Sequence, residues 1–313
     1  MAAETAEVPG APVSIDLSGS PGRHRKEGVV RALFFGAAAF SVVISAAIVL
    51  SLVGRAISFA INVDPAALWS DGWFPRRGLY DLRTIVGGTL TVTLISMIVA
   101  TPLGLGAAIY LSEYAGPRAR RSLKPIIEVL AGIPSVVMGF FALAVVAPGL
   151  VQRLWGSAPL FTLMAAGIAV GILVTPLVAS IAEDAMHAVP NSLREASVGL
   201  GARRKTTSLR VVFPAALSGI VAALIVGISR AIGETMVVAM AAGGTGGALG
   251  FAPLQPGQTM TGAMASLATG SDQVKGEALT FEALFFVGML LFLITFSLNV
   301  MSERFVRRFR ARY

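Results

Sequence analysis

The sequence predicts an all-α integral membrane protein with six spanning helices. Of its 313 residues, 55% are hydrophobic and 13% are charged, and the mean hydropathy is +0.77. A soluble domain cannot bury that much apolar surface, so the chain is expected to have the lipid bilayer as its main partner. The formal charge of +8 is therefore attributed to membrane topology, and no nucleic-acid partner is expected.

The residue types that bind metals are sparse. The sequence has no cysteine, which excludes disulfides and thiolate metal sites. Its two histidines, His24 and His187, lie far apart and have no ligand partner at metal-site spacing. We therefore expect no metal site in this chain.

Residues 1–30 are predicted to form a disordered cytoplasmic arm ahead of a membrane domain, residues 31–313. The first part of the arm is polar, rich in Ala, Pro, Gly and Ser, and without apolar periodicity. The apolar run that follows, residues 32–53, is too long for the core of a cleaved signal peptide. It is predicted to be the first membrane helix, with its N-terminus in the cytoplasm.

Five more apolar segments are each long enough to cross about 30 Å of hydrocarbon at about 1.5 Å per residue. Internal prolines are tolerated in membrane helices and often mark kinks. Gly167 and Gly171 have the spacing that favours close packing between helices. The predicted helices two to six cover residues 84–111, 125–151, 160–181, 213–241 and 281–301.

The first outer loop, residues 62–83, is rich in aromatic residues, among them Trp69, Trp73 and Tyr80. Aromatic side chains of this kind form belts at membrane interfaces. The alternative is a docking surface for an external binding protein. The residues alone favour the aromatic belt.

Basic residues are distributed unevenly among the segments that connect the helices. They concentrate in residues 23–31, 118–124, 194–210 and 304–312, whereas the other connections hold few. The positive-inside rule places segments rich in Lys and Arg in the cytoplasm. Both termini and the loop between helices four and five are therefore predicted to be cytoplasmic.

That loop, residues 183–214, is a polar stretch predicted to contain two short helices. Pro190 breaks the preceding helix, and Ser192 with Glu195 has the spacing of a capping box, so a helix is expected to start there. Gly201 suits the left-handed position that follows a helix end. A second, basic helical turn is expected after it.

The same loop carries a spaced motif. It ends at Pro214, which fits the first turn of the next helix. The residues that share the motif are Glu195-Ala196-Ser197, Gly201 and Val211-Val212-Phe213-Pro214. Their spacing resembles the coupling loop of ABC-importer permeases, which reads Glu-Ala-Ala, three residues, Gly, nine residues, Ile-x-Leu-Pro. The resemblance implies docking into a cleft on a separate ATPase subunit. An ordinary amphipathic loop is the alternative, and the fixed spacing makes it the weaker one.

Two charges fall inside the predicted fifth helix. Arg230 and Glu234 are one turn apart, on one helix face. Charged groups at such depth cost at least a few kcal/mol each, so they face protein or water and usually mark a transport pathway. The alternative is a self-neutralising pair that only locks helix packing. The residues themselves leave both interpretations open.

The surrounding sequence carries a second resemblance. Its motifs are Arg230-Ala-Ile-Gly-Glu-Thr-Met, residues 128–135 (Glu-Val-Leu-Ala-Gly-Ile-Pro-Ser), Gly88-Thr89-Leu90 and Leu111-Ser112-Glu113-Tyr114. They resemble permeases of phosphate-specific ABC importers from about residue 69 to the end of the sixth helix. The resemblance implies the type I ABC importer permease fold and a substrate pathway at Arg230, Glu234 and Thr235. An arginine suits an oxyanion because its planar fork makes two charge-assisted hydrogen bonds.

The resemblance also implies partners. The nearest approach to a phosphate-binding loop, residues 199–206, has Arg204 at a glycine position and no preceding strand. No cofactor is therefore expected in this chain, and ATP and Mg²⁺ would bind a partner ATPase dimer. The other implied partners are a second homologous permease, an extracytoplasmic phosphate-binding protein and inorganic phosphate. The implied location is the plasma membrane of a prokaryote.

Three other functions stay open at this stage. One is import of another oxyanion, sulfate or molybdate. Another is gradient-driven secondary transport, whose typical inverted repeat is not evident in the sequence. A third is a membrane subunit that signals phosphate supply, which would use the same residues, Glu195 and Arg230.

Overall fold

The computed structural model describes residues 21–244, 246–247, 251–269 and 278–309. The chain divides into two compact units, Met1–Ser51 and Leu52–Tyr313. Helix α1 (Pro21–Asn62) begins in the first unit and ends in the second.

The first unit is the N-terminal part of α1. Of the predicted disordered arm, residues 1–20 lie outside the described residues, and residues 21–30 are helical. The prediction was therefore wrong for this second part. Once an apolar helix has formed, each further residue adds one hydrogen bond at little cost, so the helix extends into the polar flank.

The second unit is built around α6 (Leu163–His187), the most completely buried of its long helices. It packs against α2 (Leu82–Ile109) and α10 (Leu217–Ile232). Added Cβ atoms at Gly167 and Gly171 would lie 2.7 Å from the Cβ atoms of Ile95 and Val99. The close approach predicted from the glycine spacing is therefore confirmed. The other long helices are α3 (Pro117–Leu130) and α13 (Ala278–Phe309).

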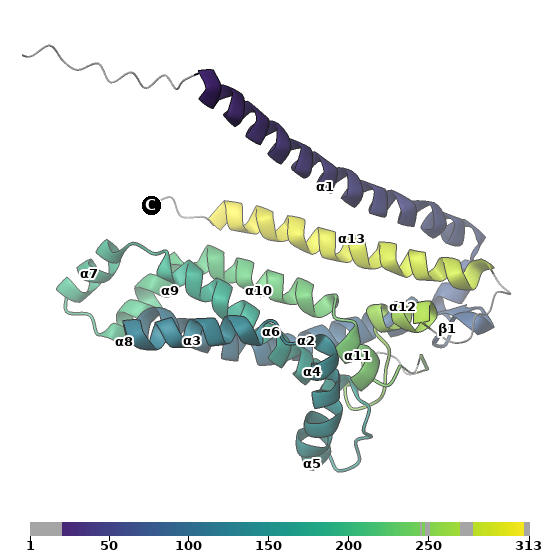
Figure 1. Cartoon of the computed structure of the whole chain (residues 1–313). Helices are drawn as coiled ribbons and strands as arrows, with labels where there is room; N and C mark the ends of the chain where they lie inside the picture. The colour runs from purple at the N-terminus through teal and green to yellow at the C-terminus, as the bar shows by residue number, and fades with distance from the viewer. Residues whose placement is uncertain (1–20, 245, 248–250, 270–277, 310–313) are drawn as a thin grey trace, which may run out of the picture. The chain divides into compact units, whose positions relative to one another are not determined.

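Short elements connect and extend these helices. Figure 1 shows α7 and α8 at one end of α6, and α12 and β1 at the other. The short helices are η1 (Pro65–Trp69), η2 (Pro75–Arg77), η3 (Tyr110–Tyr114), α4 (Ser135–Phe141), η4 (Ala142–Val151), α5 (Gln152–Leu154), α7 (Asn191–Gly199), α8 (Arg204–Thr207), η5 (Ser208–Val212), α9 (Phe213–Ala215), α11 (Met236–Ala241) and α12 (Met260–Thr269).

In the described part of the chain, five helices are long and apolar enough to cross a membrane. A bent pair, Arg204–Ala215 with Leu217–Ile232, makes a sixth if it counts as one span. This agrees with the six spans predicted. The five are Lys26–Asn62, Leu82–Tyr114, Ser135–Leu154, Leu163–His187 and Leu279–Arg304.

The third span differs from its prediction, residues 125–151. The helix around residue 125 is α3, a separate amphipathic helix without buried residues. It ends before Pro134, whose backbone is extended (φ −59°, ψ 132°), and the span begins at Ser135. Proline lacks an N–H and clashes with the preceding turn, so the helix breaks there. Figure 1 shows α4 turning away from the direction of α3.

The fifth span was predicted as one helix over residues 213–241, and this was wrong. The chain bends by 72° between α9 and α10. Pro214 consequently ends the loop segment and does not begin α10. A second break at Gly233 separates α10 from α11. Glycine is a poor helix former in a helix interior, which makes it a suitable place for the break.

The outer loop forms a small hairpin, β1 (Trp73–Phe74) with β2 (Leu79–Tyr80), an exception to the all-α prediction. Trp73 and Tyr80 face each other across it and are each 3% exposed. They belong to a core cluster with Phe59 and Met260. The aromatic-belt interpretation is therefore wrong for these two side chains, although Trp69 is exposed.

Candidate functional site

The predicted coupling helix exists as α7, but its first turn differs from the prediction. Ser192 and Glu195 do not form a capping box, because the helix begins at Asn191 and no side chain caps it. Pro190 stands at the cap position with an extended backbone (φ −57°, ψ 138°). Ser192 already lies inside the first turn, so its hydroxyl cannot act as the cap.

The end of α7 follows the prediction. Gly201 has a left-handed backbone, φ 80°. Its N–H donates to the Val198 carbonyl at 2.8 Å, and the Ala202 N–H donates to the Ser197 carbonyl at 3.1 Å. This pair of bonds is the Schellman motif, which closes a helix at a left-handed residue.

Ser197 replaces an alanine of the motif and has a contact of its own. Its side chain is buried, and its hydroxyl lies 2.9 Å from the Thr207 hydroxyl of α8. The bond joins the two short helices of the loop. A hydroxyl at this position therefore stabilises the angle between α7 and α8.

The opposite side of α7 is exposed. Glu195 and Ala196 are both exposed, as is Pro214 in α9. Val198 is 60% exposed and Leu200 is 90% exposed. Exposed apolar side chains beside a carboxylate are typical of a surface that another protein covers.

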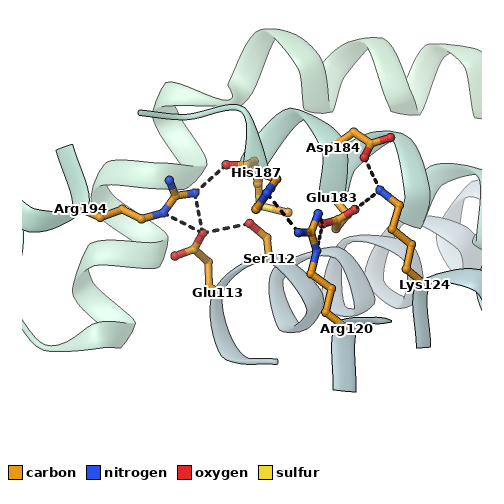
Figure 2. Close-up of polar contacts among 9 residues, drawn as sticks. Ser112, Glu113, Arg120, Lys124, Glu183, Asp184, His187 and Arg194 are labelled. Atoms are coloured by element: carbon orange, nitrogen blue, oxygen red, sulfur yellow. Dashed lines mark hydrogen bonds and ion pairs between the residues drawn. The ribbon is translucent and has the colours of Figure 1, made fainter. Parts of the chain in front are cut away.

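An ion pair anchors α7 to the end of the second span. The Arg194 guanidinium lies 3.0 Å from the Glu113 carboxylate and also donates to the Met186 carbonyl at 2.8 Å. Figure 2 shows Arg194 reaching across to Glu113, which also accepts from Ser112 at 3.0 Å. Because Met186 lies in the last turn of α6, one guanidinium joins three elements.

A second group of ion pairs joins α3 to the end of α6 (Figure 2). Glu183 is fully buried, and its two carboxylate oxygens lie 2.6 Å from an Arg120 nitrogen and 2.7 Å from the Lys124 ammonium. Lys124 also pairs with Asp184, and Arg120 lies 3.1 Å from the His187 ring. Both acidic residues were assigned to the coupling loop from the sequence, but both belong to α6.

These contacts change the titration of Lys124. Burial of its ammonium group disfavours the charge, but the hydrogen bonds that the ammonium donates to Asp184 and Glu183 outweigh burial. The pKa of Lys124 is therefore raised above its ordinary value of 10.5. Lys124 therefore carries its positive charge near neutral pH.

The second candidate site lies at the break between α10 and α11. The Arg230 guanidinium lies 2.7 Å from the Glu234 carboxylate, which confirms the predicted pair. Arg230 occupies the last turn of α10, about 20 Å along the helix from its start. Glu234 lies past the end of α10, however, so the two residues do not share one helix as predicted.

Both carboxylate oxygens of Glu234 accept hydrogen bonds. One carboxylate oxygen binds Arg230, and the other accepts from the backbone N–H groups of Met236 and Val237 at 3.2 and 3.4 Å. These are the first N–H groups of α11, which have no partner within the helix. Glu234 therefore caps α11 and orients Arg230, and it is only 3% exposed.

Arg230 is less constrained. Its side chain is 45% exposed, and Glu234 is the one partner found for it among the described residues. It lies in a strip of exposed positions that continues through Gly233 and Met236. Thr235, also predicted to line the pathway, is partly buried, and its hydroxyl lies 3.3 Å from the Gly233 carbonyl. The structure thus brings all three predicted pathway residues together.

Comparison with known proteins assigns the family. The family described as "binding-protein-dependent transport system inner membrane component" matches residues 100–311. The chain belongs to this family. It is therefore a multi-pass membrane permease subunit of a transport system.

Individual relatives agree. The chain is 30% identical over 318 residues to the phosphate transport system permease protein PstC of Mesorhizobium japonicum, covering 93% of this chain and 96% of the relative. It is also 30% identical over 260 residues to PstC of Xylella fastidiosa (strain 9a5c), covering 77% and 78%. The match to the probable ABC transporter permease protein YqgH of Bacillus subtilis is 38% identical, but it spans 60% of this chain and 62% of that relative.

Solved structures agree in fold. A chain of a bacterial ABC transporter involved in the import of the acidic polysaccharide alginate has a TM-score of 0.59 at 12% identity, covering 91% of this chain and 99% of that one. A chain of the MetNI methionine ABC transporter, in an inward-facing conformation, has a TM-score of 0.52 at 20% identity, covering 77% and 97%. The fold is thus that of type I ABC importer permeases, as predicted.

Proposed function

We propose that this chain is one of two homologous permease subunits in an ATP-driven importer of inorganic phosphate. The half-exposed guanidinium of Arg230 carries the proposal. Arginine has five N–H donors, and Glu234 is the one partner of Arg230 in the described part of the chain, which leaves most of these donors for a ligand. A tetrahedral oxyanion with several acceptor oxygens suits such a group. The relatives named PstC are phosphate permeases, which favours phosphate over sulfate or molybdate.

The second permease would face the exposed strip that contains Arg230. A pathway enclosed by one chain would bury this strip, whereas here it is open. The two permeases would rock against each other in alternating access, so that the Arg230 site opens first to one side of the membrane and then to the other.

The ATPase dimer would bind the exposed side of α7. Glu195, Ala196 and Leu200 lie on that surface, and Arg194 on the other side is bonded to α6 and to the end of the second span. A displacement of α7 would therefore move two spans at once. ATP and Mg²⁺ bind the partner, and no cofactor is assigned to this chain.

The distribution of basic residues supports cytoplasmic termini and a cytoplasmic α7. The hairpin that contains Trp73 would then lie outside, where an extracytoplasmic phosphate-binding protein would dock. The location that follows is the plasma membrane of a prokaryote.

Uptake by the assembled transporter in vesicles tests the proposal. Arg230→Gln should abolish ATP-dependent uptake of labelled phosphate, while the four subunits still co-purify. Arg153→Gln, an exposed arginine of α5, is the matched control and should transport normally. Normal phosphate uptake by Arg230→Gln would refute the role of Arg230.

Competition identifies the anion and the energy source. Unlabelled phosphate should reduce the uptake of labelled phosphate, whereas sulfate and molybdate should not. Removal of ATP should stop uptake. If sulfate or molybdate inhibits more strongly than phosphate, that anion and not phosphate is the substrate. Uptake without ATP would indicate a gradient-driven transporter.

A further inference from the structure

A chain of threonine hydroxyls connects the Arg230 site to the neighbouring helices. The Thr261 hydroxyl, at the start of α12, donates to the backbone carbonyl of Glu234 at 2.7 Å. The Thr89 hydroxyl of α2 accepts from the Met260 N–H at 2.9 Å. Thr89 and Thr261 are each 5% exposed. Buried hydrogen bonds between different elements fix the positions of those elements relative to one another.

The contact at Thr89 depends on the glycine before it. A Cβ added to Gly88 would lie 2.2 Å from the Gln258 carbonyl oxygen, a distance no real Cβ reaches. Glycine at this position therefore lets the segment ahead of α12 lie directly against α2. The Gly88-Thr89 pair, noted above as part of a sequence motif, thus has a structural explanation.

The segment between the two anchors is also fixed. The hydroxyls of Thr259 and Thr261 lie 3.1 Å apart, and the Thr259 hydroxyl accepts from the Gly262 N–H at 3.1 Å. Because the Thr261 proton is directed to Glu234, Thr259 is the donor in this pair. The result is a directed run of hydrogen bonds along the start of α12.

The carbonyl that Thr261 binds lies where the backbone needs an external partner. Glu234 follows the end of α10 and precedes α11, so its carbonyl has no helical N–H to accept from. The carboxylate of the same residue binds Arg230 at 2.7 Å. The position of Thr261 therefore determines where that carboxylate holds the guanidinium.

We propose that Thr89 and Thr261 are positioning residues of the anion site. Thr89 holds the start of α12 against α2, and Thr261 holds the Glu234 backbone, whose carboxylate orients Arg230. This inference rests on the proposed function of Arg230 as the anion-binding group. A variant that lacks either hydroxyl still contains Arg230, but the guanidinium of Arg230 loses its fixed orientation.

A labelling experiment tests this without transport. The sequence has no cysteine, so Met236→Cys gives this chain a single thiol, at a position 41% exposed and beside the ion pair. The assembled transporter without this substitution gives the background labelling of the other subunits. The rates at which this thiol reacts with anionic and with cationic methanethiosulfonate reagents are measured in the assembled transporter. Their ratio reports the local positive potential, and Arg230→Gln in the same background gives the lowest value.

Thr261→Val should lower the anionic-to-cationic rate ratio toward the value found for Arg230→Gln, because the guanidinium is then no longer held beside position 236. Thr261→Ser, which keeps the hydroxyl, should restore it. Thr89→Val should lower the ratio as well. Thr93→Val is the matched control in α2, because its buried hydroxyl donates within the same helix, to the Thr89 carbonyl at 2.7 Å.

An unchanged ratio in Thr261→Val would overturn the positioning role, and so would a reduced ratio that Thr261→Ser does not restore. An equal reduction in Thr93→Val would also overturn it, since any hydroxyl would then matter. Phosphate uptake by Arg230→Gln tests the proposed function separately. Because labelling requires no transport, the failure of one proposal is distinguishable from the failure of the other.

Discussion

Two groups of buried charge in this chain differ in how completely they are paired. At the end of α6, both carboxylate oxygens of Glu183 are taken by Arg120 and Lys124 of α3. At the end of α10, both carboxylate oxygens of Glu234 are likewise bonded, but its partner Arg230 is 45% exposed and bonds only to Glu234 among the described residues. The first group holds helices together, whereas the second leaves a cation with donors to spare.

Under the proposed function, the difference separates structural charge from ligand-binding charge. A buried charge is tolerated when its hydrogen-bonding groups are all satisfied, and it then gives no free energy to a ligand. A half-exposed guanidinium anchored on one side keeps its orientation and still binds an anion on the other. This contrast predicts which substitutions unfold the chain and which only stop transport.

The largest effect is expected at Glu183. Glu183→Gln removes the charge that compensates Arg120 and Lys124, and breaking a buried pair in this way costs about 3–5 kcal/mol. The purified transporter should show a strongly lowered unfolding temperature or fail to assemble. Glu128→Gln is the matched control, since Glu128 lies on the exposed surface of the same α3 that provides the cations.

Arg230→Gln completes that test. The glutamine amide can still donate to the Glu234 carboxylate, so the unfolding temperature should fall much less than in Glu183→Gln. Equal destabilisation by Glu183→Gln and Arg230→Gln would contradict the separation of structural from ligand-binding charge.

Much of the fold was predictable from local sequence. Apolar runs longer than a membrane is thick gave the spans, and the Gly167–Gly171 spacing gave the close contact between α6 and α2. Gly201 was correctly placed in the left-handed position. Each of these features depends on residues close together in sequence, so a pattern in the sequence is sufficient to detect it.

The pairing of charges was not predictable in the same way. Glu113 and Arg194 are 81 positions apart, and Lys124 and Glu183 are 59 apart. No local periodicity encodes such contacts. Arg230 and Glu234 were found because their i,i+4 spacing is local, yet the helix break between them was missed. The glycine at that break does not by itself end a helix.

A smaller effect is expected at Arg194. Lysine keeps the charge, but it lacks the planar fork that binds Glu113 and the Met186 carbonyl together. Arg194→Lys should therefore lower the stability of the purified complex by about 1–3 kcal/mol, the cost of unsatisfied buried hydrogen-bonding groups.

In the proposed transporter, Arg194→Lys should also reduce the coupling of ATP hydrolysis to transport. Arg118→Lys, at an exposed position of α3, is the control for both measurements. Unchanged stability and coupling in Arg194→Lys would show that this guanidinium does not join α7 to the spans.

Glu234 provides an intermediate test, since it belongs to the Arg230 pair but is itself saturated. Glu234→Gln keeps an acceptor for the first N–H groups of α11 but loses the attraction for Arg230. We expect a loss of about 1 kcal/mol in unfolding free energy, as for one hydrogen bond. Phosphate uptake should fall much more than stability does. If phosphate uptake and unfolding free energy fall to the same extent, Glu234 acts only in stability, and the distinction between structural and ligand-binding charge does not hold at this residue.

The smallest effect concerns Lys124 and pH. Its pKa is raised in the folded state, so the stability that it contributes is fully present below pH 10.5 and is lost as pH rises through the folded-state pKa. Lys124→Met lacks this contribution at every pH. The unfolding temperatures of the two proteins should thus differ by a constant amount from pH 7 to 10, worth less than about 1 kcal/mol, and converge once the pH exceeds the folded-state pKa of Lys124.

Lys205→Met corrects for the general effect of high pH, because Lys205 is an exposed lysine of α8 with no ion pair among the described residues. A difference between Lys124→Met and the unsubstituted chain that persists at high pH would mean that packing of the lysine stem, and not its charge, stabilises this end of α6. The Lys124 group and the Arg230 group would then differ in side-chain packing and not in how their charges are paired. Convergence would establish that the two groups differ in how their charges are satisfied.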